Sequence, residues 1–128
     1  MNDVRYSRTF AELVASQAHD APQALLLDWW CRLERILSYY YIAYFGEHPR
    51  SAFVAIELVA RDVRISQFTV DALHRLRVTR NKIAHGHAHI TAAEEAASYA
   101  AEAHELAWRI GACVPDELAL SSGAANVA

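Results

Sequence analysis

Three observations predict an all-α fold, an antiparallel bundle of four to five helices. Hydrophobic residues make up 54% of the 128 residues and charged residues 21%, which is too apolar for a disordered chain. Four glycines and three prolines are too few turn-forming residues for a protein of many short strands. Apolar residues recur at steps of three and four along much of the chain, as in amphipathic helices. We expect one helical domain over 1–115 and a flexible C-terminal tail over 116–128.

The first two helices are predicted from capping residues and apolar stripes. Ser7 can cap a first helix that runs to about Ala18 and has a narrow apolar face. Pro22 favours the first position of a long second helix, which we expect to end at Phe45 because Gly46 suits a helix C-terminus. Apolar residues cover much of the circumference of this helix, so we expect it to contact more than one neighbour.

A third helix is expected after the turn that follows Gly46. It can begin at Pro49 or Arg50 and is predicted to run to about Val63. Residues 64–68 are then a connector to the next helix.

The fourth and fifth helices are bounded by polar residues at their starts. The fourth is expected to begin near Thr69 and to end at Gly86. Thr91 and Glu94 have the spacing of a capping box, which would open an alanine-rich fifth helix toward Cys113. Short loops between such helices are typical of an antiparallel bundle.

Two groups of aromatic residues lie on the second helix, Trp29-Trp30 and Tyr39-Tyr40-Tyr41. Such rings can stack on nucleic-acid bases. At helical spacing we favour a place in the core and in a dimer interface, because consecutive aromatics cannot all point the same way.

The compartment and the class of partner are bounded by cysteine count, hydropathy and charge. Cys31 and Cys113 are too few for a disulfide framework, and the N-terminus does not resemble a secretory signal, so we expect a cytoplasmic protein. No run approaches the ~20 apolar residues of a membrane span. A net charge of −3 argues against a surface that coats nucleic acid, although the basic residues between Arg61 and Lys82 suit either a local basic cleft or an ordinary solvated helix.

A polar stripe is predicted at the end of the fourth helix. The helical repeat places Asn81 and His85 one above the other, with Arg77 and His74 on the same side. Lys82 lies beside this stripe and adds positive charge.

Arg80 is predicted on the face that the same helix must bury, between Leu73 and Leu76. An unpaired buried charge costs several kcal/mol, so we expect its guanidinium to contact a carboxylate, a phosphate or a protein–protein interface. Glu34 and Asp28 of the second helix are the candidate carboxylates.

The segment Arg80-Asn81-Lys82-Ile83-Ala84-His85-Gly86 resembles the signature of HEPN domains. The resemblance implies a small helical bundle that usually dimerises, and a metal-independent endoribonuclease of toxin or defence type. It would make His85 the general acid or base for attack of a ribose 2′-hydroxyl on the adjacent phosphate, and Arg80 the phosphate ligand. Asn81, Arg77, Lys82 and His74 would support the site or bind substrate. One imidazole cannot easily be both acid and base, so a homodimer would supply a second His85.

The expected partners are an RNA substrate and a second copy of the chain, with an antitoxin as a further candidate. Some HEPN toxins are controlled by a nucleotidyltransferase partner that modifies a tyrosine two residues after the motif histidine, but this chain has His87 there. We expect no cofactor and no metal, since the alternating His85, His87 and His89 lack cysteine or carboxylate neighbours.

Two other functional interpretations stay open at this point. The chain can be a catalytically inactive HEPN-like module for dimerisation, interaction or nucleotide binding, or an unrelated helical bundle with a chance motif. In either case Arg80 would form a buried salt bridge and His85 would cap the carbonyls of a helix end.

Overall fold

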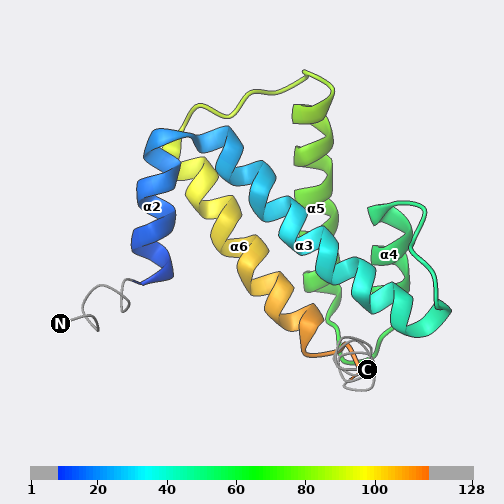
Figure 1. Cartoon of the computed structure of the whole chain (residues 1–128). Coiled ribbons are helices and arrows are strands. Elements are labelled where there is room, and N and C mark those ends of the chain that lie inside the picture. The colour runs from blue at the N-terminus through cyan, green and yellow to red at the C-terminus, as the bar shows by residue number, and fades with distance from the viewer. Residues whose placement is uncertain (1–8, 116–128) are drawn as a thin grey trace, which may run out of the picture.

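The computed structural model describes residues 9–115, and this part of the chain contains five α-helices and no strand. The all-α prediction is therefore confirmed. Ser7 and the predicted tail at 116–128 lie outside the described residues. The helices, shown in Figure 1, are α2 (Phe10–Asp20), α3 (Pro22–Phe45), α4 (Ala52–Val59), α5 (Gln67–Ala84) and α6 (Ala93–Gly111).

The most extensive helix pair, α3 and α6, runs in one direction, and an antiparallel arrangement is wrong for this pair (Figure 1). At the N-terminal ends the backbone N–H of Ile90 donates to Gln23 Oε1 at 2.9 Å. Further along, Ile36 and Gly111 line one pocket. The two helices can be parallel because residues 85–92 return the chain to the N-terminal end of α3 before α6 begins.

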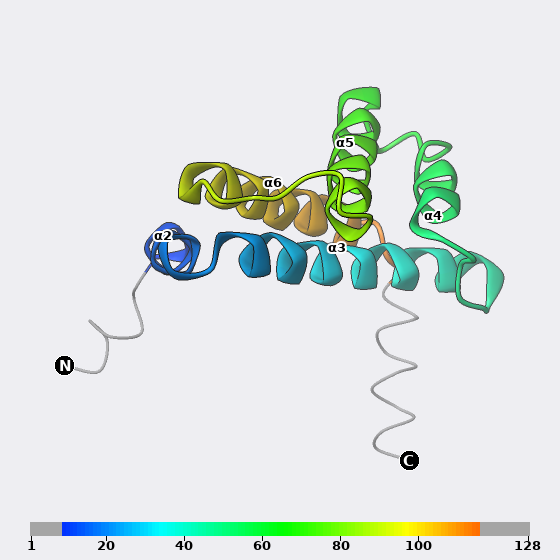
Figure 2. The ribbon, with the colours of Figure 1, turned by 90° about the horizontal axis from the view of Figure 1, so that it is seen from above.

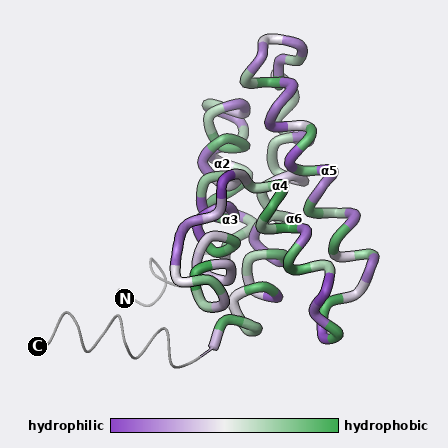
Figure 3. The backbone as a smooth tube through the Cα atoms, turned by 90° about the vertical axis from the view of Figure 1, so that its right-hand side faces the viewer, coloured by the Kyte–Doolittle hydropathy of each residue, from purple (hydrophilic) through white to green (hydrophobic). Residues whose placement is uncertain are grey.

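The helix α5 crosses this pair at a steep angle, and α4 packs against both α3 and α5 (Figure 2). Hydrophilic and hydrophobic residues alternate along α5 in Figure 3, as expected for a helix with one face on the core. The buried apolar residues of α5 are Val70, Ala72, Leu73, Leu76 and Ile83. The opposite side of α5 carries polar residues.

Buried side chains from all five helices form one core. Trp30 and Tyr40 are each 1% exposed, while Trp29 and Tyr41 are partly buried and Tyr39 is 46% exposed. The expectation that these aromatics build the core thus holds for most of them, and their place in a dimer interface stays a prediction. The largest fully buried side chains are Trp30, Tyr40, Leu26, Leu33, Leu37, Ile56, Leu73, Ile110 and Val59.

The bounds of α3 are those predicted from the sequence, Pro22–Phe45, with Gly46 in the left-handed region at φ 72°. The helix α2 begins at Phe10, because the side chain of Thr9 accepts a hydrogen bond from the first turn. It ends at Asp20, slightly beyond the predicted end.

The predicted bounds of α4 are wrong at both ends. The helix begins after Ser51, whose hydroxyl caps the first turn, and not at Pro49 or Arg50. It ends at Val59 rather than Val63, because the chain turns directly after it with short-range backbone hydrogen bonds.

The predicted starts of α5 and α6 also need correction. Ser66 caps α5, while Thr69 is 2% exposed and its hydroxyl accepts a hydrogen bond from Arg109 at 3.2 Å. The capping box predicted at Thr91 is wrong, because Ala92 is the N-cap and no side chain caps α6.

A partly buried polar cluster holds the connector between α4 and α5 against α3. The Tyr40 hydroxyl donates to Asp62 Oδ2 at 2.8 Å, and Arg64 donates to the same carboxylate at 3.0 and 2.7 Å and to the Cys113 carbonyl at 3.3 Å. The hydrogen bonds from Arg64 hold the pKa of Asp62 well below its usual range. Burial, and then the hydrogen bond to Asp62, raise the pKa of the Tyr40 hydroxyl.

Candidate functional site

The C-terminal end of α5 is closed by a Schellman motif. Gly86 has φ +74°, and its N–H donates to the Ile83 carbonyl at 3.1 Å. The His87 N–H donates to the Lys82 carbonyl at 2.7 Å. This ending makes His85 the C-cap residue, and its side chain is exposed.

A polar pocket of about 200 Å³ lies one turn before this end, between α3, α4 and α5. Three predicted site residues of α5 line it, Arg77, Arg80 and Asn81, together with Glu34 of α3. Its remaining lining residues are Trp30, Ser51, Ala52 and Phe53. The structure therefore brings part of the predicted site together at one place.

Arg80 lies at the junction of this pocket with the core. Its side chain is partly buried, and Nη1 donates to Asn81 Oδ1 at 3.3 Å. Burial raises the pKa of Tyr99 on α6, and the positive charge of Arg80 partly opposes that rise. Within the described residues, no carboxylate lies within 4.0 Å of the Arg80 guanidinium.

The two carboxylates considered as partners for Arg80 have different places. Asp28 pairs with Arg32 at 3.1 Å and does not line the pocket. Glu34 lines the pocket with Arg80 but forms no ion pair with it. An internal salt bridge of Arg80, one of the alternatives that the sequence left open, is therefore absent from residues 9–115.

Arg77 is held in place by two neighbours. Its guanidinium lies 5.1 Å from the centroid of the Phe53 ring, and Nε donates to His74 Nδ1 at 3.3 Å. His74 Nε2 in turn lies 3.7 Å from Glu57 Oε1. His74 thus orients Arg77 from outside the pocket, and the Nη groups of Arg77 have no hydrogen-bond partner among the residues described.

Arg77, Arg80 and Lys82 at the end of α5 form no ion pair in the described part of the chain, and the same is true of Arg35, Arg50 and Arg61. Four arginines form ion pairs in the part of the structure described, namely Arg32–Asp28, Arg64–Asp62, Arg75–Glu102 and Arg109–Glu105. An anionic ligand at this end of α5 would meet cations that are not already neutralised.

His85 does not line the pocket that contains Arg80. Its ring is exposed, and the nearest aromatic ring is that of His87, with centroids 6.2 Å apart. Lys82 is also exposed and lies outside the pocket. One copy of the chain therefore presents the guanidinium and the imidazole on different parts of the α5 surface.

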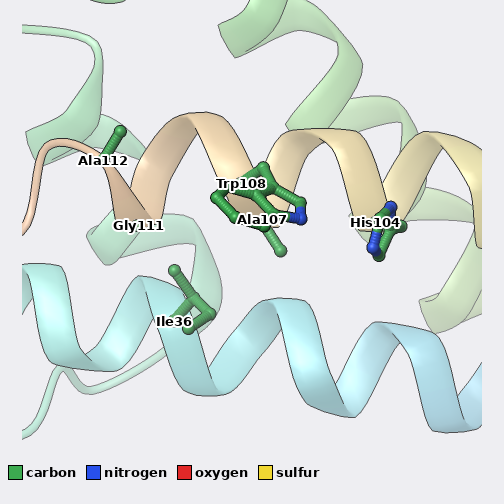
Figure 4. Close-up of a pocket in the computed structure, with 6 residues that line it drawn as sticks. All are labelled: Ile36, His104, Ala107, Trp108, Gly111 and Ala112. Atoms are coloured by element: carbon green, nitrogen blue, oxygen red, sulfur yellow. The ribbon is translucent and has the colours of Figure 1, made fainter.

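A larger pocket, of about 380 Å³, lies between α3 and α6 and contains none of the predicted site residues (Figure 4). Its lining is mostly apolar, and Trp108 beside it is 71% exposed. A mostly apolar lining offers few hydrogen-bond donors to a phosphate.

Four residues of the polar pocket were not predicted for the site, Trp30, Ser51, Ala52 and Phe53. Ser51 had a readable signal, since it precedes an apolar run as an N-cap residue does. Trp30 reads as a core residue, and its buried indole N–H has no hydrogen-bond partner in the described residues. Nothing in the sequence indicates that Phe53 meets Arg77, because α4 and α5 are brought together only by the fold.

Among residues 9–115, no group of three or more histidine, cysteine or acidic side chains could hold a metal ion. No helix in that range is both long and apolar enough to cross a membrane.

Comparisons with known proteins identify no relative: no family model, curated protein or solved structure matches this chain.

Proposed function

We propose that this chain is a metal-independent endoribonuclease that cleaves RNA at a cleft shared by two copies. The observation that carries the proposal is Arg80, a partly buried guanidinium beside a polar pocket with no carboxylate partner in the described residues. Such a group is a suitable ligand for a phosphate, which a guanidinium can bind through two parallel N–H donors.

The proposed reaction is attack of a ribose 2′-hydroxyl on the adjacent phosphorus. The bond to the 5′-oxygen of the next nucleotide breaks, which leaves a 2′,3′-cyclic phosphate and a free 5′-hydroxyl. Arg80 stabilises the charge that develops on the phosphoryl oxygens. His85 moves a proton, either from the 2′-hydroxyl or to the leaving oxygen.

A second copy of the chain completes this mechanism for two reasons. His85 lies outside the pocket of its own Arg80, so the proposed chemistry at a phosphate bound there needs an imidazole from another chain. Two imidazoles also provide the acid and the base that a single one cannot provide at once. A homodimer is thus part of the proposal.

The same separation of His85 from Arg80 favours a second candidate, a catalytically inactive HEPN-like module that dimerises or binds a nucleotide. A pocket with two unpaired guanidinium groups can bind a phosphorylated ligand without any chemistry. The two candidates differ in turnover of RNA.

The test is cleavage of mixed RNA by purified protein in EDTA. The variants are Arg80→Ala and His85→Ala, with Arg35→Ala and His87→Ala as controls of matched residue type that are exposed and lie outside the pocket. We expect Arg80→Ala and His85→Ala each to lower the rate by about 10²-fold or more while the controls stay near wild type. Intact RNA at high protein concentration, or equal cleavage by all five proteins, removes the proposal.

A further inference from the structure

The polar pocket carries both signs of charge on facing elements. Glu34 contributes a carboxylate from α3, and Arg77 and Arg80 contribute guanidinium groups from α5. All three side chains are partly buried and line the same space, yet no ion pair within 4.0 Å joins Glu34 to either arginine in the described structure. A ligand that presents donors on one side and acceptors on the other can satisfy both groups at once.

A phosphate alone does not fit this lining. The Glu34 carboxylate on the α3 side of the pocket repels an anion that lies beside it, whereas Arg80 on the α5 side can bind a phosphate. The volume of about 200 Å³ is also below the roughly 300–1,000 Å³ of sites for drug-sized molecules, so it suits a single planar ring system. The occupant of the interior is therefore expected to be neutral, small and rich in hydrogen-bonding groups.

We propose that this pocket receives one unpaired guanine base of an RNA strand, next to the phosphate bound by Arg80. This inference rests on the proposed function and names the base that the site selects. Unpaired bases in RNA are commonly read by side chains on their Watson–Crick and Hoogsteen edges.

Guanine matches the carboxylate because two of its donors, N1–H and the N2 amino group, are adjacent and point the same way. A carboxylate accepts both through its two oxygens. The other bases place a lone pair beside their donor: N1 beside the amino group of adenine, N3 beside that of cytosine, and two carbonyls around N3–H of uracil. Each of these lone pairs would face the negative charge of Glu34, so the pocket discriminates against all three bases.

Guanine also matches the basic side of the pocket. Its O6 and N7 atoms are acceptors, and an arginine that donates to both is a common contact for this base. Arg77 is placed for this role because Phe53 and His74 fix its guanidinium while its Nη groups stay free of partners in the described residues. Arg80 remains available to the phosphate.

The experiment measures equilibrium binding of the four nucleoside 3′-monophosphates to the full chain. It uses the His85→Ala variant, which cannot turn over RNA under the proposed mechanism. We expect guanosine 3′-monophosphate to bind roughly tenfold to a hundredfold more tightly than the other three. Inosine 3′-monophosphate, which lacks only the N2 amino group, should bind more weakly than the guanosine compound.

Glu34→Gln is the diagnostic substitution, because an amide presents N–H groups to the donors of guanine and removes the charge. This change should abolish the preference for guanine while binding of the other nucleotides stays unchanged or becomes tighter. Asp28→Asn is the matched control on the same helix, outside the pocket, and should keep the preference. Thermal unfolding of both variants separates a change in recognition from a failure to fold.

Equal affinities for all four nucleotides, no binding at millimolar concentration, or a guanine preference that survives Glu34→Gln would each overturn the inference. Its failure can be told apart from failure of the proposed function. Guanine-selective binding without RNA cleavage by the wild type would support recognition of guanine by this pocket and contradict the proposed nuclease activity. RNA cleavage without base preference would support the proposed nuclease and contradict recognition of guanine by this pocket.

Discussion

Replacing Tyr40 by phenylalanine removes one hydroxyl from the interior and leaves the packing of the ring unchanged. The Tyr40 side chain is 1% exposed, and its hydroxyl donates to Asp62 Oδ2 at 2.8 Å. Hydrogen bonds to charged groups contribute about 1.5–3 kcal/mol to stability. The Asp62 carboxylate keeps its hydrogen bonds from Arg64 in the variant, so its charge still has a partner. We therefore expect the free energy of unfolding to fall by about 2 kcal/mol at neutral pH.

Urea unfolding followed by far-UV circular dichroism measures this loss. The midpoint should fall while the dependence on urea concentration is unchanged, because the surface exposed on unfolding is nearly the same. Tyr39→Phe is the matched control, since Tyr39 is 46% exposed and makes no hydrogen bond in the described structure. A Tyr40→Phe variant no less stable than Tyr39→Phe would refute the view that this cluster fixes the connector between α4 and α5.

Three further predictions concern helix ends and the connector between α4 and α5. The pKa of Asp62 is held low by Arg64, so its contribution to stability is complete above the unfolded-state pKa of roughly 3.9 and is lost as the pH falls further. Asp62→Asn should thus flatten the acid side of a plot of urea midpoint against pH, and an unchanged slope would contradict this. Gly86→Ala should cost about 1 kcal/mol because alanine is strained at φ +74°, whereas Gly111→Ala within α6, where an added Cβ meets no atom within 4 Å, should be neutral or stabilising in thermal unfolding. Ser66→Ala should cost about 1 kcal/mol as the loss of an N-cap, and Thr91→Ala should leave the melting temperature nearly unchanged. If Ser66→Ala and Thr91→Ala lowered the melting temperature equally, Thr91 would cap α6, in contradiction to the structure.

Local signals in the sequence predicted α3 and the end of α5 well. Pro22 and Gly46 bound α3, and Gly86 closes α5, because proline and glycine act through their own backbone geometry. The ends of α4 and the start of α6 were wrong, since several polar residues compete to cap a short helix and the choice depends on tertiary contacts. The parallel course of α3 and α6 could not be read from loop lengths, because the returning loop is stretched along the bundle.

The candidate site was predicted in part for the same reason. The helical repeat placed Arg80 toward the core, and Arg77 and Asn81 on a polar stripe with His85. In the structure Arg77, Arg80 and Asn81 line one pocket and His85 does not. The repeat could not show that Glu34 faces the pocket without an ion pair, or that Phe53 lies against Arg77, since both facts depend on how three helices meet. His85 lies apart from Arg80 within one chain, which the spacing of five residues had indicated.

The most direct test of the account is RNA cleavage by mixtures of wild-type and His85→Ala chains that have been refolded together so that subunits exchange. If the cleft needs His85 from two copies, activity per wild-type chain should fall in proportion to the fraction of wild-type chains, because mixed pairs are inactive. Constant activity per wild-type chain at every ratio would contradict the shared cleft.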